Sequence, residues 1–69
     1  MEKIIHFIDR KLASATKYPQ YAQSFFAHAF GALEYHMLHN PADESDLICL
    51  WEEKYYNAFN AIIYGGGEV

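Results

Sequence analysis

The sequence has little that would staple a small fold together or anchor it in a membrane. Its one cysteine, Cys49, cannot form a disulfide within the chain, and a lone thiol fits a reducing compartment. No apolar run approaches the roughly 20 residues that cross a bilayer. The N-terminus lacks a signal-peptide layout, because charged residues interrupt its apolar positions. We therefore expect a cytoplasmic protein with no membrane segment.

Positive charge is also scarce, since five Lys and Arg residues stand against nine acidic ones and give a net charge of −4. The cations gather at one end: residues 1–17 carry a net charge of +2 and residues 18–69 a net charge of −6. An acidic chain lacks the bulk electrostatics that bind nucleic acid. The basic first segment is suited to docking on an acidic surface, either its own or a partner's.

Aromatic residues are abundant for one small domain: five Phe, six Tyr and one Trp in 69 residues. A chain of this length buries only about 60% of the surface that it exposes when unfolded. More apolar surface than one copy can hide indicates a partner surface. We therefore expect a homodimer or higher homo-oligomer, with an unidentified protein partner as the other way to cover that surface.

Apolar residues recur with helical periodicity in three segments, approximately residues 2–15, 19–39 and 41–64. The glycine run that starts at Gly65 predicts a stop, with residues 65–69 frayed. The sequence predicts one all-α domain over residues 1–69, in which a short N-terminal helix precedes a long antiparallel helical hairpin. Pairing of such hairpins would give an oligomeric helical bundle.

Two prolines mark the boundaries between these segments. The residue before Pro19 is pushed out of the α region, which predicts a break there, although a kinked continuous helix is the alternative. Asn40 suits the N-cap of the third helix and Pro41 its first turn, although Asp43 or Ser45 could cap a later start. The short connection at Asn40 requires the second and third helices to fold back on each other.

The widest apolar arcs supply the candidate interface residues. Tyrosine together with tryptophan is typical of protein–protein hot spots. Few cations accompany these aromatic residues, which argues against their stacking on nucleic-acid bases. Gly31 lies mid-helix in a strip of small residues, which indicates either a close backbone approach or a solvated face. The residues that we expect at a self-association or partner interface, with some of them in the core, are Phe26, Phe30, Met37, Trp51, Tyr55 and Phe59.

One carboxylate falls inside an apolar arc. Glu52 lies in the stripe of the third helix, and folding the hairpin about Asn40 places it level with His28. A buried carboxylate needs a partner. We expect a buried polar pair of Glu52 with His28, or a pairing of Glu52 with a tyrosine hydroxyl or with Arg10 or Lys11. Such a pair more often has a structural role than a catalytic one.

The remaining reactive side chains form no known motif. His36 and His39 have a spacing that can chelate a metal, but two ligands do not make a site, and His36 reads as a hydrogen-bonded core residue. Cys49 lies away from a helix N-terminus, where its pKa would fall. The sequence therefore predicts no catalytic residue, no cofactor and no metal.

Two stretches carry a resemblance to a group of bacterial proteins. They are Ala29-Phe30-Gly31-Ala32, and Leu50-Trp51-Glu52-Glu53 followed by Phe59 and Ile63-Tyr64-Gly65. Together they resemble small uncharacterised helical proteins encoded on mobile elements of Gram-positive bacteria. The resemblance implies no activity, only an accessory gene product of a prophage or integrated element.

These features favour a non-enzymatic helical protein that self-associates and binds another protein. The alternative is a small nucleic-acid-linked regulator that presents the basic first helix, or an acidic decoy that binds a DNA-binding protein through residues 18–69.

Overall fold

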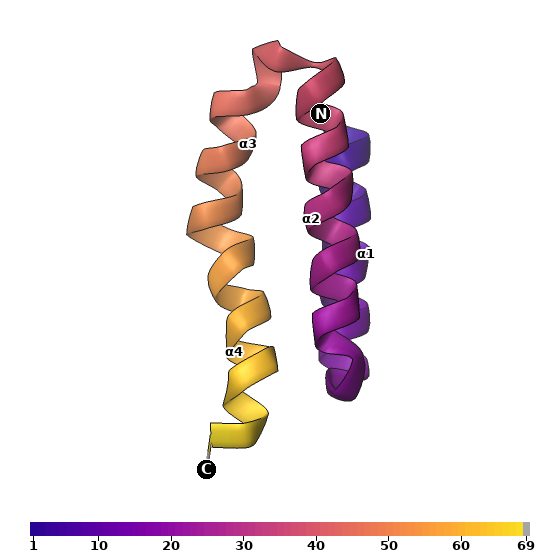
Figure 1. Ribbon diagram of the computed structural model, residues 1–69, viewed down its shortest axis with the longest axis vertical. Coiled ribbons are helices and arrows are strands. Elements are labelled where there is room, and N and C mark those ends of the chain that lie inside the picture. The colour runs from indigo at the N-terminus through magenta and orange to yellow at the C-terminus, as the bar shows by residue number, and fades with distance from the viewer. Residues whose placement is uncertain (69) are drawn as a thin grey trace.

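The computed structural model describes residues 1–68, and it describes side-chain surroundings for residues 1–65 (Figure 1). Three helices make up this part of the chain, which contains no strand. The prediction of an all-α protein is confirmed. The elements in chain order are α1 (Glu2–Lys17), the 3₁₀ turn η1 (Pro19–Tyr21), α2 (Ala22–His39), the 3₁₀ turn η2 (Pro41–Asp43), and a third helix built from α3 (Glu44–Leu50), the π-helical turn η3 (Trp51–Tyr55) and α4 (Tyr56–Glu68).

The three helices lie along one axis in an elongated body of 41 × 17 × 15 Å. α1 and α2 run antiparallel and lie against each other, and the third helix returns along α2 from the η2 turn (Figure 1). Tyr18 has φ −125° and ψ 72°, outside the α region, so the chain reverses before Pro19. The alternative of one kinked helix through Pro19 is therefore wrong.

Small residues allow α1 and α2 to approach closely. Ala15, Ala22 and Ala29 are buried, and their methyl groups leave room for the facing backbone. Ile8 of α1 and Leu33 of α2 are also buried and form part of the hydrophobic core. The basic first helix thus packs on its own chain through its apolar stripe.

The third helix buries Leu47, Trp51, Tyr55 and Phe59, which are four residues apart. In a straight α-helix each step of four advances the stripe by about 40°, so the four positions would spread over about 120°. The π-helical turn counteracts this drift. The N–H of Tyr56 donates to the carbonyl of Trp51, five residues back, and one extra residue in the turn rotates the following positions back by about 100°. The four side chains consequently face the core together.

Two helix ends differ from the sequence-based expectation. Asn40 makes no side-chain cap at the start of η2. Its Nδ2 instead donates to the carbonyl of His36 at 3.0 Å, so Asn40 ends α2. α4 continues through the glycines to Glu68 instead of stopping at Tyr64, and none of the glycines that the structure describes has a positive φ. Glycine can adopt helical angles at a cost of about 1 kcal/mol relative to Ala. Of the expected frayed tail, Val69 lies outside the described residues.

Candidate functional site

A groove between the second and third helices is the candidate functional site. Its α2 wall carries Phe30, Leu33, Glu34 and Met37, a spacing that places all four on one face of the helix. Its other wall comes from α3, η3 and the start of α4. The residues of that wall are Ile48, Trp51, Glu52 and Tyr56. The groove has a volume of about 370 Å³, and we call it the α2–α3 groove.

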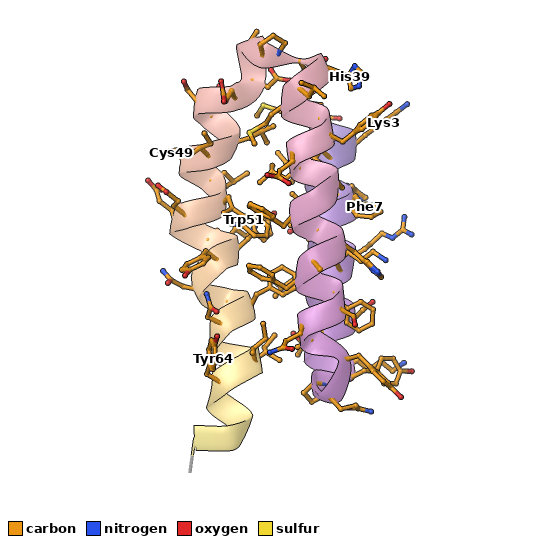
Figure 2. All side chains as sticks on the ribbon, viewed as in Figure 1. Lys3, Phe7, His39, Cys49, Trp51 and Tyr64 are labelled. Atoms are coloured by element: carbon orange, nitrogen blue, oxygen red, sulfur yellow. The ribbon has the colours of Figure 1, made fainter. Side chains whose placement is uncertain are left out.

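Trp51 forms the floor of the α2–α3 groove at its centre and belongs to a cluster of aromatic rings that packs beneath it. The Trp51 indole projects from η3 into the space between the helices (Figure 2). Its ring centroid lies 5.7 Å from that of Phe30, 5.5 Å from that of Phe26 and 6.0 Å from that of Phe59. Phe26 meets Phe59 edge to face at 5.5 Å. Such tilted and edge-to-face pairs are favourable beyond their buried area, so the floor is firmly packed.

The walls above this floor leave apolar surface open to solvent. Phe30 is 39% exposed and Ile48 40% exposed, whereas Trp51 is 6% exposed. A bulky apolar side chain that enters the groove would therefore touch the aromatic floor and remove the two rim residues from water.

Both charged residues that line the groove are acidic, and they lie on opposite walls. Glu34 is on α2 and Glu52 on η3, and both are exposed. No Lys, Arg or His is among the lining residues. Neither carboxylate forms an ion pair among the side chains of residues 1–65. The groove thus has an apolar centre with a negative charge on each side.

A second hollow, of about 410 Å³, lies on the outer face of α1. Glu2, Lys3, His6, Phe7 and Arg10, all on that one helix, line it. Lys3 and Phe7 point outward from the bundle (Figure 2). Because a single helix supplies every lining residue, this hollow lacks a second wall, and we place the candidate site in the α2–α3 groove.

Five of the six predicted interface residues come together in the aromatic cluster, and Met37 lines the groove farther along α2. The six residues differ in their exposure to solvent. Tyr55 and Phe59 are fully buried and Trp51 nearly so, because the π-helical turn aims all three at the core. These three are core residues, as the prediction allowed for some of the six, and Trp51 also forms the groove floor. Phe30 and Met37 line the groove, and Phe26 is half-buried beside it.

The predicted buried pair of His28 and Glu52 does not form. Both residues are exposed, and no polar or charged residue is buried in the part of the chain that the structure describes. The π-helical turn explains why Glu52 is exposed. It narrows the core stripe to the face that carries Trp51 and Tyr55, and Glu52 lies outside that face. His28 instead lies edge-on to Phe25, with ring centroids 6.5 Å apart.

The polar contact that does join the first and third helices was missed by sequence reasoning. The Tyr55 hydroxyl donates to Asp9 Oδ1 at 2.5 Å, and Lys54 Nζ lies 3.8 Å from the same oxygen. Burial raises the pKa of the Tyr55 phenol, and the Asp9 carboxylate raises it further by accepting a hydrogen bond from the hydroxyl and by its negative charge. In this contact the acid, Asp9, comes from α1 and the base, Lys54, from η3. The expected pairing had the acid Glu52 on the third helix and a base, Arg10 or Lys11, on the first.

The two histidines at the end of α2 take separate partners. His36 Nε2 lies 3.0 Å from Asp43 Oδ2 across the η2 turn, so His36 is hydrogen-bonded as expected, but it is half-buried and not the core residue that was predicted. His39 packs on Tyr35, with ring centroids 4.4 Å apart. Within the described residues, no three His, Cys, Asp or Glu side chains gather as a metal ligand set would.

Cys49 lies on the outer side of α3, away from the groove (Figure 2). Its thiol donates to Glu53 Oε2 at 3.5 Å. This hydrogen bond and the negative charge of Glu53 raise the pKa of the thiol. A raised pKa disfavours the thiolate, which is the nucleophilic form. The surroundings of Cys49 are therefore the opposite of those that activate a cysteine.

Comparison of the chain with protein-family models, with curated proteins and with solved structures gives no match. The resemblance to mobile-element proteins stays a prediction. Among the described residues, no helix combines the length and the apolar character that crossing a bilayer requires.

Proposed function

We propose that this chain is a non-enzymatic interaction protein that binds one amphipathic helix in the α2–α3 groove. The observation that carries the proposal is an apolar groove between two helices, with Phe30 and Ile48 exposed on its rims and the Trp51 ring on its floor. Grooves of this kind bind helices through apolar residues at positions i, i+3 or i+4, and i+7.

The dimensions of the groove support this occupant. The α2 wall runs from Phe30 to Met37 and the opposite wall from Ile48 to Tyr56. At 1.5 Å per residue these walls are about 10 and about 12 Å long, which corresponds to about two turns of a helix. A partner helix laid over the two walls would cover the groove and give a helical bundle with a closed core.

Self-association through the same groove is the second candidate. Two copies that pack groove to groove would bury the Phe30 and Ile48 rims and would give a homodimer, or a higher homo-oligomer. The exposure of both rim residues favours it. The burial of Trp51, Tyr55 and Phe59 within one chain leaves less apolar surface to be covered than the composition suggested.

Light scattering on a size-exclusion column, over a hundredfold range of protein concentration, separates the two candidates. A mass that rises with concentration and falls back in an Ile48→Ser variant would support self-association through the groove. A constant monomer mass would leave the groove available for another protein. The matched control is Tyr35→Ser, because Tyr35 is exposed but is not among the residues that line the groove.

Trp51 provides a direct reporter of groove occupancy, because it is the only tryptophan of the chain and forms the groove floor. Titration with an amphipathic helical peptide that lacks Trp and Tyr should change its emission. A monomer whose Trp51 emission no such peptide alters would contradict the proposed function.

A further inference from the structure

We infer that the helix bound in the α2–α3 groove is cationic, with Lys or Arg residues on both flanks of its apolar stripe. This inference rests on the proposed function and names the chemical class of the partner. Glu34 and Glu52 stand on opposite walls of the groove, each beside its apolar lining residues. A helix that inserts its apolar stripe between the walls therefore meets a carboxylate on either side.

Among the side chains of residues 1–65, no cation neutralises these two carboxylates. No Lys, Arg or His lines the groove. Lys54, the one cation of the third helix, lies 3.8 Å from Asp9 and over the Tyr55 ring, so its charge is directed to α1. A neutral or acidic helix in the groove would leave Glu34 and Glu52 without opposite charge, whereas Lys or Arg flanks would supply it.

The chain segment that leads into one wall of the groove is also negatively charged. Residues 43–53 hold five acidic residues and no Lys or Arg: Asp43, Glu44, Asp46, Glu52 and Glu53. A like-signed field around an apolar site attracts an oppositely charged partner and accelerates its association at low ionic strength. Both the contact charges and the surrounding field thus select a cationic helix.

A second copy of this chain fits the groove less well. Its only cationic helix is α1, whose apolar residues Ile4 and Ile8 are buried in its own core, so α1 offers no free apolar stripe. Packing groove against groove would bring Glu34 and Glu52 near their own counterparts, and like charges at an interface oppose association. The bound helix therefore belongs to another protein.

The test uses the full chain and three synthetic peptides of about 18 residues, long enough to form a helix. All three share one leucine stripe and lack Trp and Tyr; the residues that flank the stripe are Lys, Gln or Glu. Binding is read from Trp51 emission and from calorimetry. Because an exposed ion pair contributes between about 1.4-fold and 5-fold, two pairs predict that the Lys peptide binds about 2- to 25-fold more tightly than the Gln peptide at low salt. The Glu peptide should bind most weakly, and added salt should reduce the differences.

Single isosteric variants locate the effect. Glu34→Gln and Glu52→Gln should each reduce the preference for the Lys peptide, and the double variant should abolish it. Glu2→Gln changes the net charge equally but lies on the outer face of α1, and it should leave the preference intact. Both glutamates of the groove are exposed, so the variants keep the fold.

The outcomes separate the two levels of the proposal. If no peptide alters Trp51 emission or gives heat of binding, the proposed function fails. If the Lys and Glu peptides bind equally, or if Glu2→Gln acts as strongly as the groove variants, a helix binds but the inference about its charge is overturned. Self-association that strengthens with salt and excludes the Lys peptide would show that a second copy occupies the groove, which also overturns the inference.

Discussion

Replacing Tyr55 with phenylalanine should destabilise the protein by about 1 kcal/mol at neutral pH. The ring stays in the aromatic cluster, so only the hydroxyl and its 2.5 Å hydrogen bond to Asp9 are lost. A hydrogen bond to a charged group contributes about 1.5–3 kcal/mol. The Asp9 side chain is 47% exposed, however, and water can replace the lost donor, which reduces the effect to about 1 kcal/mol. The midpoint of thermal unfolding should fall by about 4–8 °C.

The same substitution should remove a pH dependence at alkaline pH. The pKa of Tyr55 is raised in the folded chain, whereas in the unfolded chain it returns to about 10. Below pH 10 both states hold the proton, and the contribution of Tyr55 to stability is complete. Above pH 10 the unfolded chain loses the proton that the folded chain keeps. The unfolding free energy then falls by up to about 1.4 kcal/mol per pH unit on account of this group, and the fall continues up to the folded pKa.

Urea denaturation followed by circular dichroism, at several values between about pH 8 and pH 11, measures this effect. The difference in unfolding free energy between the natural chain and Tyr55→Phe should be constant up to about pH 9 and then shrink to about zero by pH 11, because only the natural chain has the extra titration. Other alkaline titrations are common to both chains and cancel. A difference that stays constant to pH 11 would refute the reasoning. Asp9→Asn is the control, since it keeps a hydrogen-bond acceptor but removes the charge, and it should weaken the pH dependence.

Three further predictions concern single positions. Gly31→Ala should stabilise α2 by about 1 kcal/mol in thermal unfolding, because Gly31 is exposed in mid-helix and nothing lies within 4 Å of the added Cβ; a loss of stability would reveal a close partner there. Phe59→Ala should cost about 3–5 kcal/mol, which removes most of the stability of so small a domain in urea titrations; a cost below about 1 kcal/mol would contradict a central role for this ring. Cys49 should react slowly with dithionitrobenzoate at neutral pH, and Glu53→Gln should accelerate the reaction because it removes the charge that raises the thiol pKa; equal rates would count against that cause.

Local patterns in the sequence were sufficient for the helices and their connections. The 3.6-residue periodicity located all three helices, and Pro19 and Pro41 each begin a 3₁₀ turn that separates two of them. Proline acts through its own ring and on the residue before it, so its effect needs no tertiary contact. The strip around Gly31, for which the sequence left two interpretations open, is a solvated face.

The π-helical turn was not predicted, and it accounts for the errors at the site. A regular α-helix spreads the apolar residues of this helix, from Leu47 through Phe59 to Ile63, over a broad arc that includes Glu52, which made Glu52 look buried. Large apolar residues four apart over three steps are the signal that could have revealed the turn. A repeat of four is longer than the α-helical repeat of 3.6, so in a straight α-helix these side chains drift steadily around the helix.

The contact of Tyr55 with Asp9 could not be found from periodicity at all. Asp9 lies on the polar side of the α1 wheel when that helix is considered alone, and its partner is 46 residues away in the sequence. Only the packing of the third helix against α1 brings the two together. Likewise, the α2–α3 groove depends on how far apart two helices stand, which the residue pattern of either helix does not specify.

The third helix contacts α2 at both ends of the groove. At one end the η2 turn is closed by His36 and Asp43, and at the other Phe59 is packed into the aromatic cluster with Phe26. The walls are therefore spaced before any partner arrives, and the binding site is preorganised. The conformational entropy lost on binding then falls almost entirely on the incoming segment. Among partners with the same side chains, the one whose segment is already helical in isolation would bind most tightly.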